Sequence, residues 1–348
     1  MKHNPVACFL LLLALSLNGC DRSIAPSPSP TSTSWYAVYF TDPEEPSAET
    51  FRGGVDQYLV EAINQAQRSV DVAIYDLNLW SLRDALIAAH QRGLQVRLVT
   101  ESDNFDEAEI QELIEAGVPV LGDRREGLMH NKFVVIDGQE VCSGSLNFTT
   151  SDAYLNNNNL ICITSPNLAQ DYTVEFEEMF LDDHFGPDTR PNTPYPELEI
   201  DGTRLGIYFS PDDGTASHLI ELINGAQRNI YFLVYSFTSD EIAQALAERH
   251  QAGVEIAGVL EQAQVASNAG TEFDNLRLAG IDVRLDGNPR NMHHKVIIID
   301  ERILVTGSYN FSASAEQRND ENTLVVYNPQ LARLYLAEFE RIFAQTQE

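Results

Sequence analysis

Basic side chains are scarce in this chain. It has 22 Lys and Arg residues against 52 Asp and Glu residues in a total of 348, which gives a formal net charge of −30 at pH 7 with His neutral. Proteins that hold a long polyanion usually carry a basic surface. The charge therefore argues against a long nucleic acid as a standing partner, although a local positive field inside a site can oppose the net charge.

Long apolar runs are missing beyond the first residues. Residues 6–17 are apolar but too few to span a bilayer as a helix, and they follow Lys2. The run ends in Leu-Asn-Gly-Cys20, which resembles a bacterial lipoprotein signal, with a plain secretory signal as the alternative. We therefore expect residues 1–20 to be a signal peptide that ends at a lipidated Cys20.

The stretch that follows is rich in Ser and Pro and has little with which to build a core. Residues 21–37 are interpreted as a tether between the lipid and the folded part. The expected location is therefore the periplasmic or cell-surface side of a bacterial membrane, which the protein contacts through its lipid anchor.

Cysteine is also scarce. Four cysteines are present, two of them in the leader, and none forms a CxxC pair, so there is no signal for a zinc site. Cys142 and Cys162 align with Val305 and Val325 of the repeat described next. We interpret both as small buried apolar residues on strands. A disulfide between them is an open alternative in an exported protein.

One pattern of chemically active residues occurs twice at a constant distance. The differences 293 − 130, 295 − 132, 300 − 137 and 310 − 147 all equal 163. The first copy contains His130, Lys132, Asp137, Ser145 and Asn147, and the second contains His293, Lys295, Asp300, Ser308 and Asn310. Similarity extends upstream, where residues 63–68 return as 223–228 at an offset of 160. So long a period does not indicate a solenoid. It indicates two halves of one globular unit related by a pseudo-twofold axis.

Apolar strands and amphipathic helices alternate in both halves, which predicts an α/β fold with mixed sheets covered by helices. In the first half we expect strands at 70–75, 94–99, 133–136, 141–143 and 160–163 and helices at 82–91, 109–116 and 168–181. Each has a counterpart in the second half. The expected units are repeat 1 at 38–186, a linker at 187–205 and repeat 2 at 206–348.

The repeated residue types suit the chemistry of a phosphodiester. An enzyme that cleaves this anion needs positive charge at its oxygens, a nucleophile in line, and an acid for the leaving oxygen. On a strand, His and Lys two residues apart project to the same face. Lys132 and Lys295 would neutralise the phosphate, and Asn147 and Asn310 would donate hydrogen bonds to it.

The duplicated HxKxxxxD and GSxN motifs resemble those of the phospholipase D superfamily, the HKD phosphodiesterases. The resemblance covers both halves. It implies a single shared active site that needs no metal or other cofactor, and a two-step reaction in which one His forms a phosphohistidine and the other acts as general acid and base. It also implies that Asp137, Asp300, Ser145 and Ser308 are structural.

The two copies differ at the position 28 residues after each motif His. It is Glu321 in the second copy and Asn158 in the first. Members of the family carry an acidic or amide residue here that holds a motif His, across the pseudo-twofold axis. Glu321 would then support His130, and Asn158 would support His293. A carboxylate stabilises a positively charged imidazole, which predicts His130 as nucleophile and His293 as acid.

Four functions fit this pattern. The leading hypothesis is a phospholipase D-type hydrolase that cleaves the head-group phosphodiester of a phospholipid. A secreted or periplasmic metal-independent endonuclease is the alternative, followed by a phosphatidyltransferase similar to cardiolipin synthase and by a non-catalytic lipid-binding module. A monomer is expected because both half-sites lie in one chain.

Three other histidines are not assigned to the chemistry. His294 is interpreted as a neighbour of His293 without a part of its own. His90 and His250 lie near the ends of predicted helices in both halves, where a capping role is expected. Arg124 and Arg125 precede the first motif and are either at the mouth of the site or simply at the surface.

Overall fold

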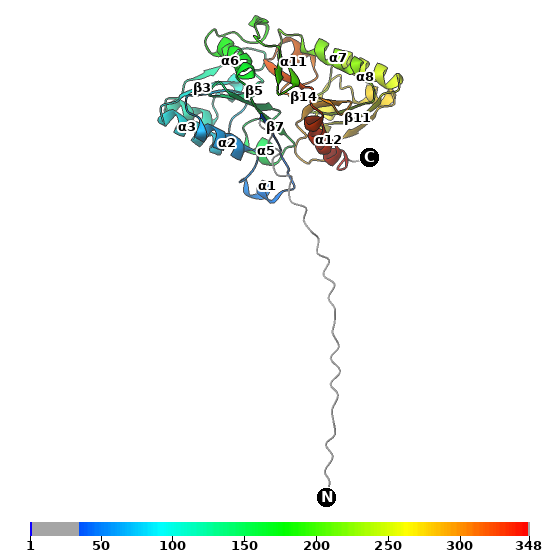
Figure 1. Cartoon of the computed structure of the whole chain (residues 1–348), viewed down its shortest axis with the longest axis horizontal. Helices are drawn as coiled ribbons and strands as arrows, with labels where there is room; N and C mark the ends of the chain where they lie inside the picture. The colour runs from blue at the N-terminus through cyan, green and yellow to red at the C-terminus, as the bar shows by residue number, and fades with distance from the viewer. Residues whose placement is uncertain (2–34, 347–348) are drawn as a thin grey trace.

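The computed structural model describes residue 1 and residues 35–346, which form two similar halves, each built on one β-sheet (Figure 1). The expected signal peptide, Cys20 and nearly all of the tether lie outside the described residues. Within the described part, no helix is long and apolar enough to cross a membrane.

The first half contains the seven-stranded sheet and the helices that cover it. Its elements are β1 (Tyr36–Phe40), α1 (Pro46–Thr50), α2 (Asp56–Gln65), β2 (Ser69–Ile74), α3 (Trp80–Gln91), β3 (Gln95–Thr100), α4 (Ala108–Glu115), β4 (Val120–Gly122), β5 (Lys132–Ile136), β6 (Glu140–Gly144), α5 (Thr150–Tyr154), β7 (Asn159–Thr164) and α6 (Pro166–Phe180).

The second half repeats this order around an eight-stranded sheet. Its elements are β8 (Glu197–Ile200), β9 (Thr203–Ser210), α7 (Thr215–Gly225), β10 (Asn229–Val234), α8 (Asp240–Gln251), β11 (Glu255–Leu260), α9 (Gln262–Ser267), α10 (Phe273–Leu278), β12 (Asp282–Leu285), β13 (Lys295–Ile299), β14 (Ile303–Gly307), α11 (Ala313–Gln317), β15 (Glu321–Val326) and α12 (Pro329–Phe343).

Both sheets are mixed and have the same topology. The strand order is β1-β7-β6-β5-β2-β3-β4 in the first and, written from the opposite edge, β12-β11-β10-β13-β14-β15-β9-β8 in the second. Three neighbouring strands are parallel in each sheet, β2 to β4 and β10 to β12, and the remaining pairs are antiparallel. The predicted α/β class and the two tandem repeats are confirmed.

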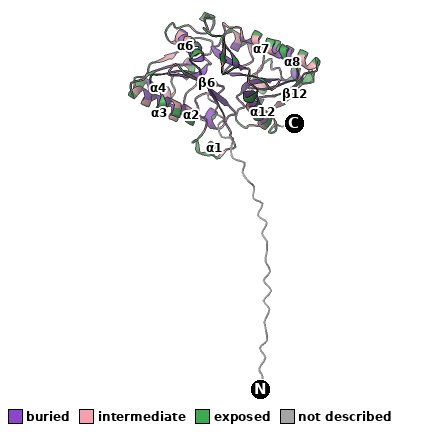
Figure 2. Cartoon of the chain, in the orientation of Figure 1, coloured by how far each residue is buried: buried purple, intermediate pink, exposed green. Residues whose placement is uncertain are grey.

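The central strands are buried on both faces. β5 and β13 are runs of β-branched and aromatic residues after their Lys, and every residue in them is buried. Figure 2 shows buried strands inside the molecule and helices whose outer faces are exposed. After α3 and α8 the chain turns at Gly93 and Gly253, whose φ values of 89° and 95° favour glycine.

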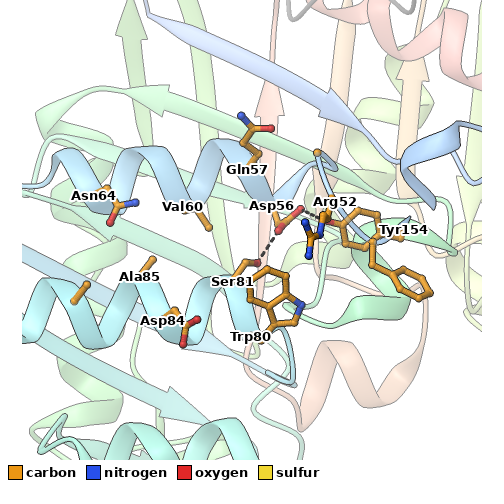
Figure 3. Close-up of a pocket in the computed structure, with 13 residues that line it drawn as sticks. Arg52, Asp56, Gln57, Val60, Asn64, Trp80, Ser81, Asp84, Ala85 and Tyr154 are labelled. Carbon is orange, nitrogen blue, oxygen red and sulfur yellow. Dashed lines mark hydrogen bonds between the residues drawn. The ribbon is translucent and has the colours of Figure 1, made fainter. Parts of the chain in front are cut away.

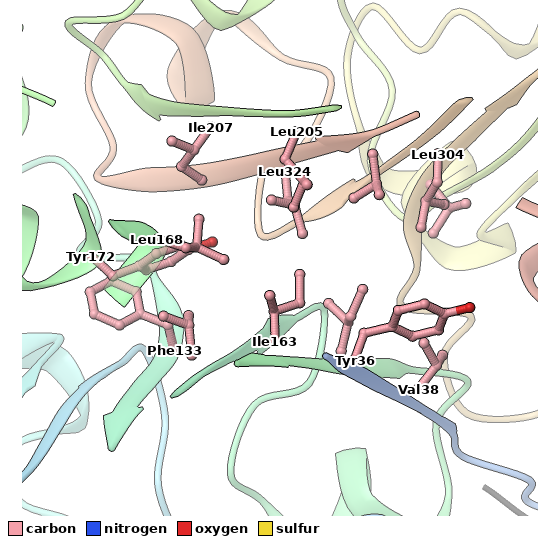
Figure 4. Packing of buried hydrophobic residues seen from close by; sticks show 14 of the residues in the cluster. Tyr36, Val38, Phe133, Ile163, Leu168, Tyr172, Leu205, Ile207, Leu304 and Leu324 are labelled. Carbon is pink, nitrogen blue, oxygen red and sulfur yellow. The ribbon is translucent and has the colours of Figure 1, made fainter. Parts of the chain in front are cut away.

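One hydrophobic core joins the two halves. It contains side chains of β1 and β7 from the first half and of β9 and β15 from the second, together with inner faces of α6 and α12. In Figure 4, Ile163 and Tyr36 of the first half face Leu324 and Leu205 of the second across this core. Two further cores lie within the separate halves. The halves therefore form a single packed unit, which fixes the two motifs relative to each other.

The motif aspartates hold turns. Asp137 accepts hydrogen bonds from the backbone N–H groups of residues 67–69, and Asp300 does the same with residues 227–229. Both residues have a positive φ, 54° and 53°. These contacts fit the structural role that the resemblance implies.

The repeats differ in length before their first long helix and at the linker. Tyr39 of β1 and Tyr208 of β9 are equivalent at an offset of 169, but the following helices align at 160, so the first half carries nine additional residues (169 − 160). These residues include α1. Strand β8 is formed by the expected linker and has no counterpart in the first half.

The structure decides the alternative that was left open for the two cysteines. Cys142 and Cys162 are buried on strands as expected, but they form a disulfide. They are direct partners in the antiparallel pair β6–β7, with Cα atoms 4.0 Å apart. The cross-strand register places the two side chains together, and sequence spacing alone did not show this.

Candidate active site

The motif histidines lie at the seam between the halves. Strands β5 and β13 begin at Lys132 and Lys295. The motif histidines therefore precede these strands, whereas the sequence predicted that they lie on them. The backbone N–H of His130 donates to the carbonyl of Asp320 in the other half, at 3.0 Å. That of His293 donates to the carbonyl of Asn157, at 2.9 Å. Each His backbone is therefore held by the opposite repeat.

The imidazole of His130 is held by a carboxyl group from the second repeat. Its Nδ1 lies 2.7 Å from Oε2 of Glu321. The same oxygen accepts a hydrogen bond from the Ser308 hydroxyl at 2.7 Å. Both His130 and Glu321 are buried. This contact fixes the ring and leaves Nε2 as the free nitrogen.

The imidazole of His293 has neutral hydrogen-bond partners from the first repeat. Its Nδ1 lies 3.1 Å from both the side-chain oxygen of Asn158 and the carbonyl of Ser145. The Ser145 hydroxyl donates to Asn158 Oδ1 at 2.8 Å. The structure thus has the crosswise geometry that the sequence predicts, with Glu321 at His130 and Asn158 at His293. The catalytic roles remain predictions.

Two buried lysines carry the positive charge of the site. Lys132 Nζ donates to the carbonyl of His130 and Lys295 Nζ to the carbonyl of His293, each at 2.8 Å. The rings of Tyr75 and Tyr235 lie 5.1 and 4.7 Å from the two ammonium groups. Burial lowers the pKa of Lys132 to about 8, and burial together with the charge of Lys132 lowers the pKa of Lys295 well below its ordinary value.

The histidines respond to the same burial and charge. Burial, and then the two lysines, lower the pKa of His130 and of His293 well below the ordinary value. Burial raises the pKa of Glu321 to about 7, against the opposing effect of Lys132. The site therefore disfavours additional positive charge. A bound phosphodiester anion would relieve this strain by neutralising the lysines.

The asparagines of the GSxN motifs each have a side-chain oxygen without a partner. Oδ1 of Asn147 and Oδ1 of Asn310 are buried and have no hydrogen-bond partner within the described chain. Both follow tight turns at Gly144 and Gly307, where an added Cβ would come within 2.4 and 2.2 Å of a backbone oxygen of β7 or β15. Such turns require glycine, and they place the two amides beside the lysines' strands.

A polar network behind the histidines was not predicted. Asn159 donates to His294 Nδ1 at 3.0 Å, and His294 Nε2 lies 3.1 Å from Glu338. At the equivalent positions Asn322 donates to Asn131 at 2.9 Å, and Asn131 lies 3.4 Å from Glu175. Both sets cross from one half to the other.

His294 therefore has its own role, and its interpretation as a mere neighbour of His293 is wrong. It is fully buried and connects β7 with α12. Burial alone would raise the pKa of Glu338, but hydrogen bonds from His294 and Arg341 lower it. The aligned Glu175 lacks such cationic partners, and its burial raises its pKa well above the ordinary value. Asn159 and Asn322 occupy the same position in the two repeats, and this match was the sequence signal that could have indicated the network.

Asp152 is a second group that sequence reasoning missed. It lies on α5, is buried, and places Oδ2 3.7 Å from Nδ1 of His293. Its counterpart in the second repeat is Ala315 (152 + 163). No motif marks this position. Glu321 is therefore not the only carboxyl group near a catalytic histidine.

The remaining candidates lie outside the site. Arg124 pairs with Asp183 at 2.5 Å, and Arg125 donates to the Asp183 backbone carbonyl at 2.9 Å. Both arginines therefore have partners near the surface. His250 Nδ1 lies 3.2 Å from the carbonyl of Val254, as expected of a residue at a helix end. Among the described residues, no group of three or more His, Cys, Asp or Glu is arranged to hold a metal ion.

A cavity of about 460 Å³ lies apart from the histidines, between α2 and α3. Phe51 of the additional segment and Trp80 are exposed at its rim. Inside it, Asp56 accepts hydrogen bonds from Ser81 at 2.6 Å and Tyr154 at 2.8 Å (Figure 3). None of the duplicated motif residues lines this cavity, so the chemistry does not occur there.

Comparison with known families agrees with this geometry. The family model described as "Cardiolipin synthase, PLD-like domain" matches residues 59–180 and 219–343, one segment in each half. The chain belongs to this phospholipase D-like family.

Curated relatives match over a length close to one repeat. Mitochondrial cardiolipin hydrolase from Homo sapiens is 38% identical over 133 residues, 38% of this chain and 52% of that protein. Phospholipase D from Rickettsia prowazekii is 32% identical over 142 residues, 41% of this chain and 69% of that protein. This chain thus spans about half the length of the human relative.

A solved structure matches across both halves. Phosphatidylserine synthase from Haemophilus influenzae superposes with a TM-score of 0.67 and covers 89% of this chain and 87% of its own. The two chains are 16% identical. This likeness shows the fold with its two repeats. The family match, supported by this fold, places the chain in the phospholipase D superfamily.

Glu321 and Asn158 hold the two motif histidines, so variants at these positions compare a charged partner with a neutral one. We expect Glu321→Gln to slow the first step on a nitrophenyl phosphodiester by about 100-fold, because the attacking imidazole loses its carboxylate. Asn158→Ala should slow that step far less, because the nitrophenolate leaves with little help from the acid. Single-turnover kinetics of the nitrophenolate burst measure both. Equal losses in the two variants would contradict the assignment of His130 as nucleophile.

Proposed function

We propose that the protein hydrolyses the head-group phosphodiester of a phospholipid through a phosphohistidine intermediate. The observation that carries the proposal is the paired site, in which His130 with Glu321 and His293 with Asn158 flank two buried lysines. In support, the cited relatives are named phospholipase D and cardiolipin hydrolase.

In the first step, His130 Nε2 attacks phosphorus. The lowered pKa of His130 leaves its ring neutral, so a lone pair is present on that nitrogen. The N–P bond forms as the bond from phosphorus to the head-group oxygen breaks, and His293 gives a proton to that oxygen. Lys132 and Lys295 stabilise the charge that develops on the non-bridging oxygens.

In the second step, water replaces the leaving alcohol. His293, now neutral, takes a proton from the water as it attacks phosphorus. The N–P bond breaks, which regenerates His130 and releases phosphatidic acid. If an alcohol took the place of water, the same steps would transfer the phosphatidyl group. Because both half-sites lie in one chain, we propose a monomer with one site.

A parallel assay tests the substrate class. Residues 21–348 are offered phosphatidylcholine, cardiolipin and single-stranded DNA in the presence of EDTA. We expect release of a lipid head group, little cleavage of DNA, and retained activity in EDTA, because the lysines supply the positive charge. A His130→Ala variant should be inactive, and Asp274→Asn, an exposed change far from the motifs in sequence, should be fully active. Cleavage of DNA alone, or activity that depends on an added divalent cation, would contradict the proposal.

We also propose export and attachment through Cys20, which rests on the leader sequence alone. Cys20→Ser should shift the protein from the membrane fraction to the soluble fraction, or leave the unprocessed precursor, as seen by fractionation and mass spectrometry. Unchanged membrane association of a processed variant would show that the lipid is not the anchor.

A further inference from the structure

His293 has a carboxyl group close to it, but in a different position from that of His130. Asp152 Oδ2 lies 3.7 Å from His293 Nδ1, whereas Glu321 Oε2 lies 2.7 Å from His130 Nδ1. The first distance is beyond a hydrogen bond, and the Nδ1 of His293 is already directed at the neutral oxygens of Asn158 and Ser145. Any effect of Asp152 on this ring would therefore act through its charge and not through a hydrogen bond.

The two repeats have exchanged the positions of their carboxyl groups. At the start of β7 and β15 the aligned pair is Asn158, which directly precedes β7, and Glu321, and on α5 and α11 it is Asp152 and Ala315. Each repeat thus supplies one carboxyl group to the histidine of the other. As a result, the carboxyl group is in direct contact with the imidazole of His130 but lies beyond hydrogen-bond distance of the imidazole of His293.

Asp152 is held firmly in this place. Its Oδ2 accepts a hydrogen bond from the backbone N–H of Asn147 at 2.8 Å, and its Oδ1 accepts one from the Asn156 amide. Its own N–H donates to the hydroxyl of Thr149, the N-cap of α5, at 3.1 Å. Both oxygens accept, which is the arrangement that an ionised carboxylate requires.

We propose that Asp152 is a positioning residue that keeps His293 protonated until it gives its proton to the leaving group. The proposal rests on the function proposed above, in which His293 is the general acid. A carboxylate in direct contact would hold the imidazolium more tightly, as suits a nucleophile that becomes positively charged. A carboxylate at 3.7 Å stabilises the positive charge of the imidazolium and still allows its proton to transfer to the leaving group.

Other charged and titratable groups act on His293 as well. Lys295, Lys132 and His130 disfavour its protonation, as does burial. The Tyr235 ring lies with its centroid 4.5 Å from that of His293. Asp76 is near enough to be influenced by both Asp152 and Lys132. A substrate phosphate would neutralise the lysines and so remove part of what disfavours the protonated form of His293.

The test is the pH dependence of kcat/KM for Asp152→Asn in the full mature chain, with diphenyl phosphate and bis(4-nitrophenyl) phosphate as probes. Removing the charge lowers the pKa of His293, so the protonated acid is lost at lower pH. For diphenyl phosphate, whose leaving group needs protonation, we expect the alkaline limb to move down by about one pH unit or more. The nitrophenyl ester should lose less than about threefold, because its leaving group needs little acid.

Two further variants separate charge from structure. Thr149→Ala removes the cap of the same helix and should lower the melting temperature without moving the alkaline limb. The double change Asp152→Ala with Asn158→Glu copies the Ala315 and Glu321 arrangement. It should move the limb back up relative to Asp152→Asn.

An independent readout is the titration of His293 followed by NMR in the protein without substrate. Its pKa should be lower in Asp152→Asn than in the wild-type protein. A folded Asp152→Asn variant with an unchanged His293 titration, or with equal losses on the two esters, would overturn the proposal. If this titration shifts while no lipid is cleaved, the role of Asp152 stands and the proposed substrate fails.

Discussion

The contact between His130 and Glu321 joins the two halves of the protein at the place where the chemistry would occur. The histidine precedes β5 in the first repeat, and the carboxyl group begins β15 in the second. On the opposite side, Asn158 reaches His293 in the same crosswise way. Neither repeat completes its own histidine. The shared core, the two turns at the motif aspartates and the buried amide network all serve to keep this seam in register.

Burial of like charges is the cost of this arrangement. Two lysines and two histidines converge with almost no exposure to water, so the pKa values of all four fall. Carbonyl oxygens of the motif histidines accept hydrogen bonds from the ammonium groups, and Glu321 and Asp152 supply negative charge near the rings. A site with this balance favours an anion at its centre, and it gains most when that anion accumulates charge in the transition state.

Much of this arrangement could be predicted, because the two repeats can be recognised in the sequence. The constant offset of 163 between motifs predicted the pseudo-twofold relation, and the family resemblance, applied to the position 28 residues after each His, implied the crosswise partners. Apolar patterns in the sequence predicted the central strands of both sheets and the helices α3, α4, α6, α8, α10 and α12 within a few residues, and they missed α2 and α7. The start of β5 after His130 was missed because the ladder begins only where β2 provides partners.

What the sequence did not show depends on register and on packing between segments far apart. Cys142 and Cys162 meet because β6 and β7 pair at that point. Asp152 reaches His293 only because α5 lies across the seam, and no spacing rule marks it. The role of His294 depends on Asn159 and Glu338, which belong to different repeats. The additional segment around α1 has no copy against which it could be compared.

The identity of the histidine that carries the covalent phosphate tests the central claim most directly. The wild-type protein would be mixed with bis(4-nitrophenyl) phosphate, quenched in base within one turnover, and digested for mass spectrometry under conditions that preserve phosphohistidine. The account predicts the phosphoryl ester on the peptide that contains His130, with none on the peptide that contains His293. A phosphorylated His293 would contradict the assignment of roles and, with it, the meaning given to the Glu321 contact.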